Sequence, residues 1–250
     1  MTKPLRLAVA GLGTVGAGIV KIVQQHGDLL AARAGRPVEV VAISARSRSK
    51  DRGVDLSGYA WEDDAVELAR RDDVDVLIEV IGGEDGPAKA AVETALANGK
   101  HVVTANKALL AIHGQNLATL AEENGVALRF EAAVAGGIPI VKALTEGLAA
   151  NKIERVMGVM NGTCNYILTV MENTGADYAD VLRDAQELGY AEADPTVDVG
   201  GFDAAHKLSL LAATAFGTQV DFNNVKIEGI ERISLTDIKD VADMGYRIKL

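Results

Sequence analysis

Acidic residues and one lysine are concentrated between residues 189 and 207, in the segment GYAEADPTVDVGGFDAAHK. The charged residues of this segment are Glu192, Asp194, Asp198, Asp203 and Lys207. Reduction of a carbonyl by hydride leaves an oxyanion, and a lysine ammonium can stabilise that charge or donate a proton to it. We therefore predict Lys207 as a proton donor that Asp203 orients. Glu192 and Asp198 are predicted to bind a cationic group of the substrate, such as an α-amino group.

The same spacing also has a purely structural interpretation. Asp203 and Lys207 are four residues apart at the start of an expected helix, so their side chains share one face. An acid in the first turn also interacts favourably with the helix dipole. A surface salt bridge of this kind stabilises a helix by a few tenths of a kcal/mol. Spacing alone does not separate this interpretation from the catalytic one.

A second lysine follows an expected strand over 101–104, in the sequence Thr104-Ala105-Asn106-Lys107. In open α/β sheets the ligand crevice lies beyond the carboxyl ends of the strands. Lys107 is therefore predicted to lie near a nicotinamide ring or a substrate carboxylate. The alternative is an exposed lysine at the start of a helix.

Cys164 is the third candidate for chemistry, as a covalent nucleophile. A nucleophilic cysteine usually needs a nearby base. None of the four histidines is close to Cys164 in the sequence. We predict a packed thiol, and a cysteine-dependent aldehyde dehydrogenase is a remote alternative.

A glycine-rich segment follows the apolar run over residues 5–10. It consists of Gly11, Leu12, Gly13, Thr14, Val15 and Gly16. A G-x-G-x-x-G segment between a strand and a helix is typical of dinucleotide binding. Its glycines allow the tight turn, the close approach of backbone N–H groups to a pyrophosphate, and close packing of the helix. The segment predicts a nicotinamide-dependent oxidoreductase, or less specifically a glycine-rich turn without a ligand.

The second expected strand, residues 38–43, indicates which nicotinamide cofactor is preferred. Sites that prefer NAD usually end this strand with Asp or Glu, which binds the ribose 2′-hydroxyl. Here no acid follows, and the cations Arg46, Arg48 and Lys50 do. A guanidinium suits a 2′-phosphate, so we predict NADP(H) over NAD(H). A solvated basic loop and dual specificity both remain open.

The elements that must position these residues alternate between strand and helix up to residue 130. Apolar runs over 5–10, 38–43, 75–81, 101–104 and 126–130 predict strands, and helical spacing predicts helices over 14–30, 61–71, 87–98 and 116–124. This alternation is typical of an α/β fold with a Rossmann-type parallel sheet. We predict an NAD(P)-binding domain over residues 1–134.

The pattern changes near residue 135, where Ala135-Gly136-Gly137-Ile138-Pro139 predicts a turn that leads into a helix. Strands are expected over 153–160 and 225–230, and helices over 162–173, 177–188, 203–216 and 235–245. These elements predict an α+β substrate-binding and catalytic domain over residues 135–250.

Composition excludes several classes of protein. The chain has 250 residues, 48% of them hydrophobic, with a net charge of −10. An acidic surface repels the phosphate backbone, so no nucleic-acid partner is expected. No apolar run reaches the ~18–20 residues that span a bilayer, and no membrane partner is expected. A single cysteine cannot form an intrachain disulfide, which suits a reducing compartment, and we predict a cytoplasmic protein.

Five segments in order resemble the homoserine dehydrogenase family over nearly the whole chain. They are GLGTVG (11–16), TANKALLA (104–111), AGGIPI (135–140), NGTCNYIL (161–168) and LGYAEADPTVDVGGFDAAHK (188–207). The resemblance implies NAD(P)-dependent interconversion of L-homoserine and L-aspartate 4-semialdehyde, a step toward threonine and methionine.

The resemblance also implies roles for individual residues. Residues 11–16 and Arg46 would hold the cofactor, and Lys107 would contact cofactor and substrate. Glu192 and Asp198 would bind homoserine, with Glu192 at its amino group, while Lys207 donates the proton with the help of Asp203. A monovalent cation, usually sodium, would lie mostly on backbone oxygens of the segment that contains Glu131, Val134, Gly136 and Ile138.

The resemblance has one departure, because members of the family continue well past residue 250. The second domain is therefore expected to be incomplete, which puts turnover in doubt, and a homodimer is expected only with the C-terminal part present. Regulation by threonine is not assumed. Two alternatives stay open: another NADP-dependent reductase of an amino-acid semialdehyde or imine, and a non-catalytic, truncated dinucleotide-binding module.

Overall fold

The computed structural model describes residues 2–250. The chain forms two compact units, unit 1 over Met1–Ala149 and unit 2 over Ala150–Leu250. Each unit has its own buried apolar side chains, and each is described separately below.

Unit 1 is built on a six-stranded sheet with the strand order β3-β2-β1-β4-β5-β6, in which every pair of neighbours is parallel. The strands are β1 (Leu5–Ala10), β2 (Val38–Ser44), β3 (Ala60–Glu62), β4 (Val76–Glu79), β5 (His101–Thr104) and β6 (Leu128–Arg129). This order is that of the Rossmann fold. The predicted α/β fold class is thereby confirmed.

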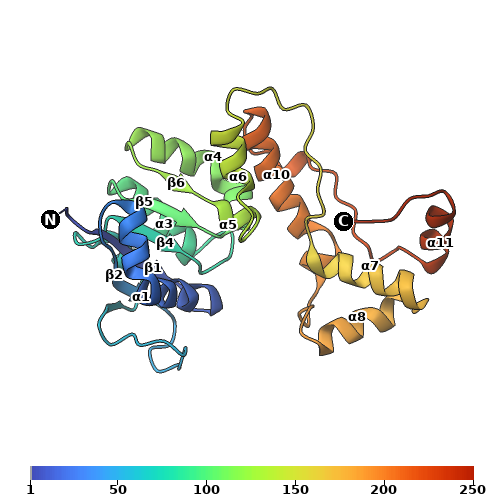
Figure 1. The fold of residues 1–250 in the computed structure, drawn as a ribbon, viewed down its shortest axis with the longest axis horizontal. Coiled ribbons are helices and arrows are strands. Elements are labelled where there is room, and N and C mark those ends of the chain that lie inside the picture. The colour runs from blue at the N-terminus through green and yellow to red at the C-terminus, as the bar shows by residue number, and fades with distance from the viewer. Residues whose placement is uncertain (1) are drawn as a thin grey trace. The chain divides into compact units, whose positions relative to one another are not determined.

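Helices connect the strands and pack on the sheet, as the blue-to-green part of the ribbon shows (Figure 1). The connecting helices are α1 (Thr14–Ala34), α2 (Ala65–Arg70), α3 (Pro87–Ala97) and α4 (Lys107–Glu123). Three short helices follow β6: α5 (Glu131–Val134), α6 (Ile140–Lys142) and the π-helix η1 (Ala143–Gly147). Local sequence signals mark their ends. Pro87 occupies the first turn of α3, and Gly99, with φ +69°, follows its last turn. Proline suits a first turn and glycine suits the left-handed position that ends a helix.

The register brings the ends of four strands together at one edge of the sheet. Ala10 of β1 pairs with Ser44 of β2 on one side and with Glu79 of β4 on the other, and Glu79 pairs in turn with Thr104 of β5. The chain leaves β1 toward β2 and later returns to β4 on the opposite side of β1. This reversal is the switch point at which open α/β sheets bind ligands.

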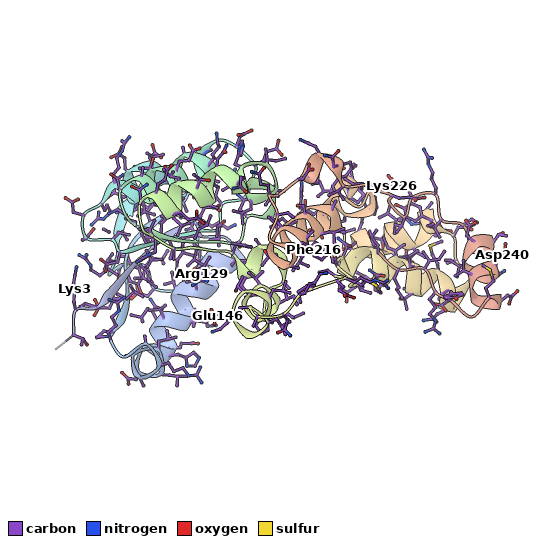
Figure 2. The ribbon with its side chains drawn as sticks, turned by 90° about the horizontal axis from the view of Figure 1, so that it is seen from above. Lys3, Arg129, Glu146, Phe216, Lys226 and Asp240 are labelled. Carbon is purple, nitrogen blue, oxygen red and sulfur yellow. The ribbon has the colours of Figure 1, made fainter. Side chains whose placement is uncertain are left out.

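Unit 2 consists of helices joined by extended segments. Its helices are α7 (Gly162–Thr174), α8 (Tyr178–Glu187), α9 (Thr196–Val199), α10 (Phe202–Phe216), the 3-10 helix η2 (Phe222–Asn224) and α11 (Leu235–Asp243). Buried side chains of α7 and α8, among them Ile167, Met171 and Val181, form its core. Figure 2 shows Asp240 of α11 projecting outward, in keeping with its exposure.

Two predicted strands and part of one predicted helix are wrong. Segments 153–160 and 225–230 are extended but form no strand in the described part of unit 2. A strand needs a ladder of backbone bonds to a neighbour, whereas Met160 N–H donates to the Leu250 carbonyl (3.2 Å) without a ladder around it. Residues 60–62 are strand β3 rather than helix, because Trp61 pairs with Ile43 of β2.

The helices of residues 2–250 can be compared with the length and apolar character of a membrane-spanning helix. None of their helices combines the length and the apolar character needed to cross a bilayer.

Candidate active site

The glycine-rich segment lies between β1 and the start of α1, and two of its glycines are required by packing. Gly11 has φ +99°, and a Cβ there would lie 2.7 Å from the carbonyl oxygen of Val80. A Cβ on Gly16 would lie 1.9 Å from the carbonyl oxygen of Gly11. Gly11 therefore allows the loop to touch the segment after β4, and Gly16 allows helix α1 to pack on the loop.

Gly13 is different, because no protein atom explains the absence of a side chain there. It has φ −76°, which any residue adopts, and a Cβ would meet nothing within 4 Å. Gly13 is also the N-cap of α1, without a side-chain hydrogen bond to the first turn and without an acid in that turn. Exposed N–H groups at a helix N-terminus attract anions. The open space over Gly13 thus fits a phosphate group approaching the backbone.

The other residues of the glycine-rich segment differ in solvent exposure. Leu12 is buried and anchors the loop in the core of unit 1, while Thr14 and Val15 are exposed. The segment therefore presents its backbone outward over a buried leucine.

The basic segment after β2 is tied to the glycine-rich segment by a residue that sequence reasoning missed. Arg52 donates hydrogen bonds to the carbonyls of Leu12 (2.9 Å), Lys50 (2.6 Å) and Ser47 (2.5 Å). Arg46 is exposed in this segment. The contact places the basic segment beside the glycine-rich one, where a 2′-phosphate would have to bind. Several cations follow β2, and nothing in their types or spacing indicates that Arg52 is the one that holds the loop.

Lys107 is the first residue of α4 and is half-buried. The preceding residue, Asn106, caps the helix by accepting a hydrogen bond from Leu109 N–H (3.1 Å). Asn106 also donates to the carbonyl of Gly83 (2.7 Å), in the loop after β4. The start of α4 is therefore fixed at the carboxyl edge of the sheet, as the sequence predicted for Lys107. The contact of Lys107 with a ligand stays a prediction.

In unit 2 the predicted pair of Asp203 and Lys207 forms. Lys207 Nζ lies 2.7 Å from Asp203 Oδ2 and 2.9 Å from the carbonyl oxygen of Met160. The side chain of Asp203 is 8% exposed and that of Lys207 is 21% exposed. An ammonium has three N–H donors, and these two bonds fix the direction of the side chain. A simple surface salt bridge would be more exposed than this pair.

Asn161 is a second residue that sequence reasoning missed, and it joins the two predicted carboxylates. Its Nδ2 donates to Asp198 Oδ1 (2.8 Å) and to Asp203 Oδ2 (3.0 Å). Its Oδ1 accepts from Cys164 N–H (2.8 Å) and so caps α7. An asparagine before a helix suggests a cap. Its link to residues 37 and 42 positions away depends on the tertiary fold.

The remaining predicted residues of unit 2 lie in different surroundings. Glu192 is exposed, and its backbone carbonyl accepts from Gln186 Nε2 (3.0 Å). Among residues 150–250 no hydrogen bond joins the Glu192 carboxylate to Asp198 or Lys207. Glu192 is thus a surface residue that lies near Asp198 and Asp203 in the sequence. Its contact with the substrate stays a prediction.

Cys164 is a packed thiol, as predicted. It is completely buried, and its Sγ lies 3.1 Å from the backbone carbonyl of Asp198. Burial, with a further contribution from the charge of Asp198, raises the pKa of the thiol to about 12. The reactive form of cysteine is the thiolate, so this environment argues against a nucleophilic role.

The predicted cation segment surrounds the turn between α5 and α6. The carboxylate of Glu131 accepts hydrogen bonds from the amides of Val141 (2.7 Å) and Lys142 (2.9 Å), so its side chain caps the next helix. Val134 ends α5, and Gly136 and Ile138 lie in the turn. Residues 2–250 contain no group of three or more His, Cys, Asp or Glu side chains that could hold a metal ion. A cation here would depend on backbone oxygens.

Comparison with known families gives two matches. Residues 11–131 match the family described as "Homoserine dehydrogenase, NAD binding domain", and residues 139–250 match the family described as "Homoserine dehydrogenase". The homoserine dehydrogenase of Neisseria gonorrhoeae is 49% identical over 248 residues, which are 99% of this chain and 57% of that protein. The chain thus spans little more than half the length of this curated relative.

Solved structures give the same result. A homoserine dehydrogenase from Thiobacillus denitrificans superposes with a TM-score of 0.95 at 46% identity, over 99% of this chain and 57% of that chain. A hyperthermophilic archaeal homoserine dehydrogenase in complex with NADPH superposes with a TM-score of 0.80 at 25% identity, over 92% of this chain and 75% of that one.

Proposed function

The chain belongs to the homoserine dehydrogenase family, and from this premise we propose that it interconverts L-homoserine and L-aspartate 4-semialdehyde with NADP(H). The observation that carries the proposal is the buried hydrogen-bond network of Lys207, Asp203 and Asn161. It supplies a directed proton donor, which carbonyl reduction requires.

The glycine-rich segment fits the dinucleotide. The open space over Gly13 and the uncapped N-terminus of α1 would receive the pyrophosphate. Gly11 lets the loop contact the segment after β4, and Gly16 lets α1 contact the loop. A bound nicotinamide supplies or accepts the hydride at its C4 atom. Lys107 at the start of α4 would contact the cofactor and the substrate from the same edge of the sheet.

Lys207 would control the proton. In the reductive direction negative charge develops on the aldehyde oxygen, and the ammonium of Lys207 stabilises that charge and donates a proton to form the hydroxyl of homoserine. In the oxidative direction the neutral amine takes the proton back. Asp203 and the Met160 carbonyl direct Nζ, so the amine does not have to be oriented during the reaction.

Carboxylates of unit 2 would bind the substrate. Asp198 is half-buried and held by Asn161, which suits a fixed binding site for the amino group. Glu192 is exposed and would reach the amino group from the surface. Together the two residues would favour an amino-bearing aldehyde over a simple one.

The NADP(H) preference leads to a measurable expectation for Arg46. Replacing Arg46 with alanine should weaken NADPH binding by about tenfold, because a charge-assisted bond to the 2′-phosphate is lost. NADH, which lacks that phosphate, should lose little affinity. Arg36→Ala is a matched control, since it removes the same charge just before the amino end of β2. Equal losses for both cofactors, measured by fluorescence titration, would count against the 2′-phosphate contact.

The proposal also covers a bound cation, the cellular compartment, the pathway and the oligomeric state. A sodium ion would be held by backbone oxygens of Glu131, Val134, Gly136 and Ile138, since the Glu131 carboxylate is engaged with amides. The reduced, buried Cys164 suits the cytoplasm. The reaction would serve threonine and methionine synthesis, and a homodimer is proposed for the protein at the length of its relatives.

The decisive assay follows NADPH absorbance with aspartate semialdehyde, and NADP⁺ reduction with homoserine. It should be run on the 250-residue chain and on a version extended to the length of its relatives. Turnover in either chain supports the proposal. Binding of NADPH without turnover in both would leave a dinucleotide-binding module, and turnover only with a different amino-acid semialdehyde would replace the substrate.

A further inference from the structure

A buried carboxylate that the proposed mechanism does not use lies at the edge of the sheet where the dinucleotide would bind. Glu79 is the last residue of β4, and it is completely buried. It pairs with Ala10 of β1 on one side and with Thr104 of β5 on the other. A buried charge is costly unless it is hydrogen-bonded, so the bonds of Glu79 indicate what it does.

Both oxygens of the Glu79 carboxylate accept hydrogen bonds from segments at this edge. Oε1 accepts from the backbone N–H groups of Ile81 (2.7 Å) and Gly82 (3.2 Å). Oε2 accepts from the hydroxyl of Thr104 (2.5 Å). The carboxylate therefore joins the loop after β4 to the end of β5.

The bond to Thr104 continues to the start of α4. The Thr104 hydroxyl accepts from Asn106 N–H (2.9 Å), and the Asn106 side chain caps α4 and donates to the Gly83 carbonyl (2.7 Å). The network therefore begins and ends in the loop after β4, at the amides of Ile81 and Gly82 and at the carbonyl of Gly83. Lys107, the residue after Asn106, is held in its place by this network.

The loop that Glu79 holds also touches the glycine-rich segment. Gly11 approaches the Val80 carbonyl so closely that a Cβ would lie 2.7 Å from it. Val80 N–H in turn donates to the Ala10 carbonyl (2.9 Å). A displacement of residues 80–83 would therefore change both the glycine-rich segment and the position of Lys107.

We infer that Glu79 is a positioning residue for the nicotinamide half of the dinucleotide. In this fold the adenosine ribose lies at the end of β2, and the dinucleotide crosses the switch point between β1 and β4. The nicotinamide half therefore lies over the end of β4, on the loop and the lysine that Glu79 fixes. This inference rests on the proposed dinucleotide binding.

The test uses Glu79→Gln, which keeps the shape of the side chain. Its amide can accept at one end only, so the Thr104 hydroxyl loses its acceptor and the network reorganises. NADPH should bind about tenfold more weakly, the effect of roughly one buried hydrogen bond. Adenosine 2′,5′-bisphosphate carries only the adenosine half, so its affinity should fall much less than that of NADPH, through the contact of residues 80–83 with Gly11 alone. Both dissociation constants can be measured by titration calorimetry on the 250-residue chain.

Asp75→Asn is the matched control, since it makes the same change just before β4, at the opposite edge of the sheet. Its amide can accept at one end only, so part of the three hydrogen bonds from Arg6 is lost and the melting temperature should fall, but both ligands should bind as they do to the wild type. An equal loss of both ligands in Glu79→Gln, or unchanged NADPH binding, would overturn the inference. A wild type that binds no dinucleotide would instead remove the proposed function, and the inference with it.

A second pair of variants covers the case in which Glu79→Gln does not fold. Thr104→Val removes the hydroxyl between Glu79 and Asn106, and Thr104→Ser retains it. Thr104→Val should weaken NADPH binding selectively, and Thr104→Ser should bind like the wild type. Wild-type affinity in Thr104→Val would contradict the positioning role.

Discussion

Replacing Lys207 with alanine should lower turnover by about 10²-fold or more, the range expected when acid–base catalysis is lost. The proposed proton donor disappears, and with it the positive charge that is proposed to stabilise the developing oxyanion. NADPH affinity should stay close to that of the wild type, because the glycine-rich and basic segments belong to unit 1. Steady-state kinetics and NADPH titration on the same preparation measure both quantities.

The control for Lys207→Ala must separate chemistry from folding. Removing Lys207 leaves the carboxylate of Asp203 with Asn161 as a donor, and breaking a buried pair is destabilising. Thermal unfolding should therefore be measured for each variant. Lys239→Ala removes an exposed lysine of α11 and should leave turnover unchanged. Near-normal turnover in a folded Lys207→Ala protein would end the catalytic role of this lysine.

The parts of the fold that the sequence predicts correctly depend on local signals. An apolar strand followed by glycines and an amphipathic helix is visible within one short window, and Pro87 and Gly99 mark the two ends of α3. The two wrong strands depend on partners elsewhere in the chain. Segments 153–160 and 225–230 have strand-like composition, but composition does not supply a neighbouring backbone.

The candidate site likewise contains residues that local spacing predicts and residues whose contacts depend on the tertiary fold. The pair of Asp203 and Lys207 is predictable because its spacing of four is a helical contact. The role of Asn161 is not, since its amide meets Asp198 and Asp203 only after α7, α9 and α10 have packed. Glu79 gave no signal either, because the strand expected over 75–81 placed it inside an apolar run and not at the strand end.

Gly16→Ala should abolish most dinucleotide binding, since the added Cβ would lie 1.9 Å from the backbone oxygen of Gly11. Backbone cannot rotate away as a side chain can, so either α1 moves off the loop or the loop is displaced. Overpacking of this kind costs about 1–3 kcal/mol. Each kcal/mol lowers the melting temperature by about 2–4 °C for a protein of this size. We expect a lower melting temperature and an NADPH affinity at least about tenfold weaker.

Gly18→Ala, two residues further along α1, is the matched control. A Cβ there would meet nothing within 4 Å, and alanine is favoured over glycine inside a helix by about 0.5–1 kcal/mol. Gly18→Ala should therefore raise the melting temperature slightly and bind NADPH like the wild type. The two variants make the same chemical change in one helix with opposite expected signs, so a general effect of alanine cannot produce the result. Wild-type NADPH affinity in Gly16→Ala would show that binding does not need α1 packed against Gly11, and the glycine-rich segment would lose its place as the pyrophosphate site.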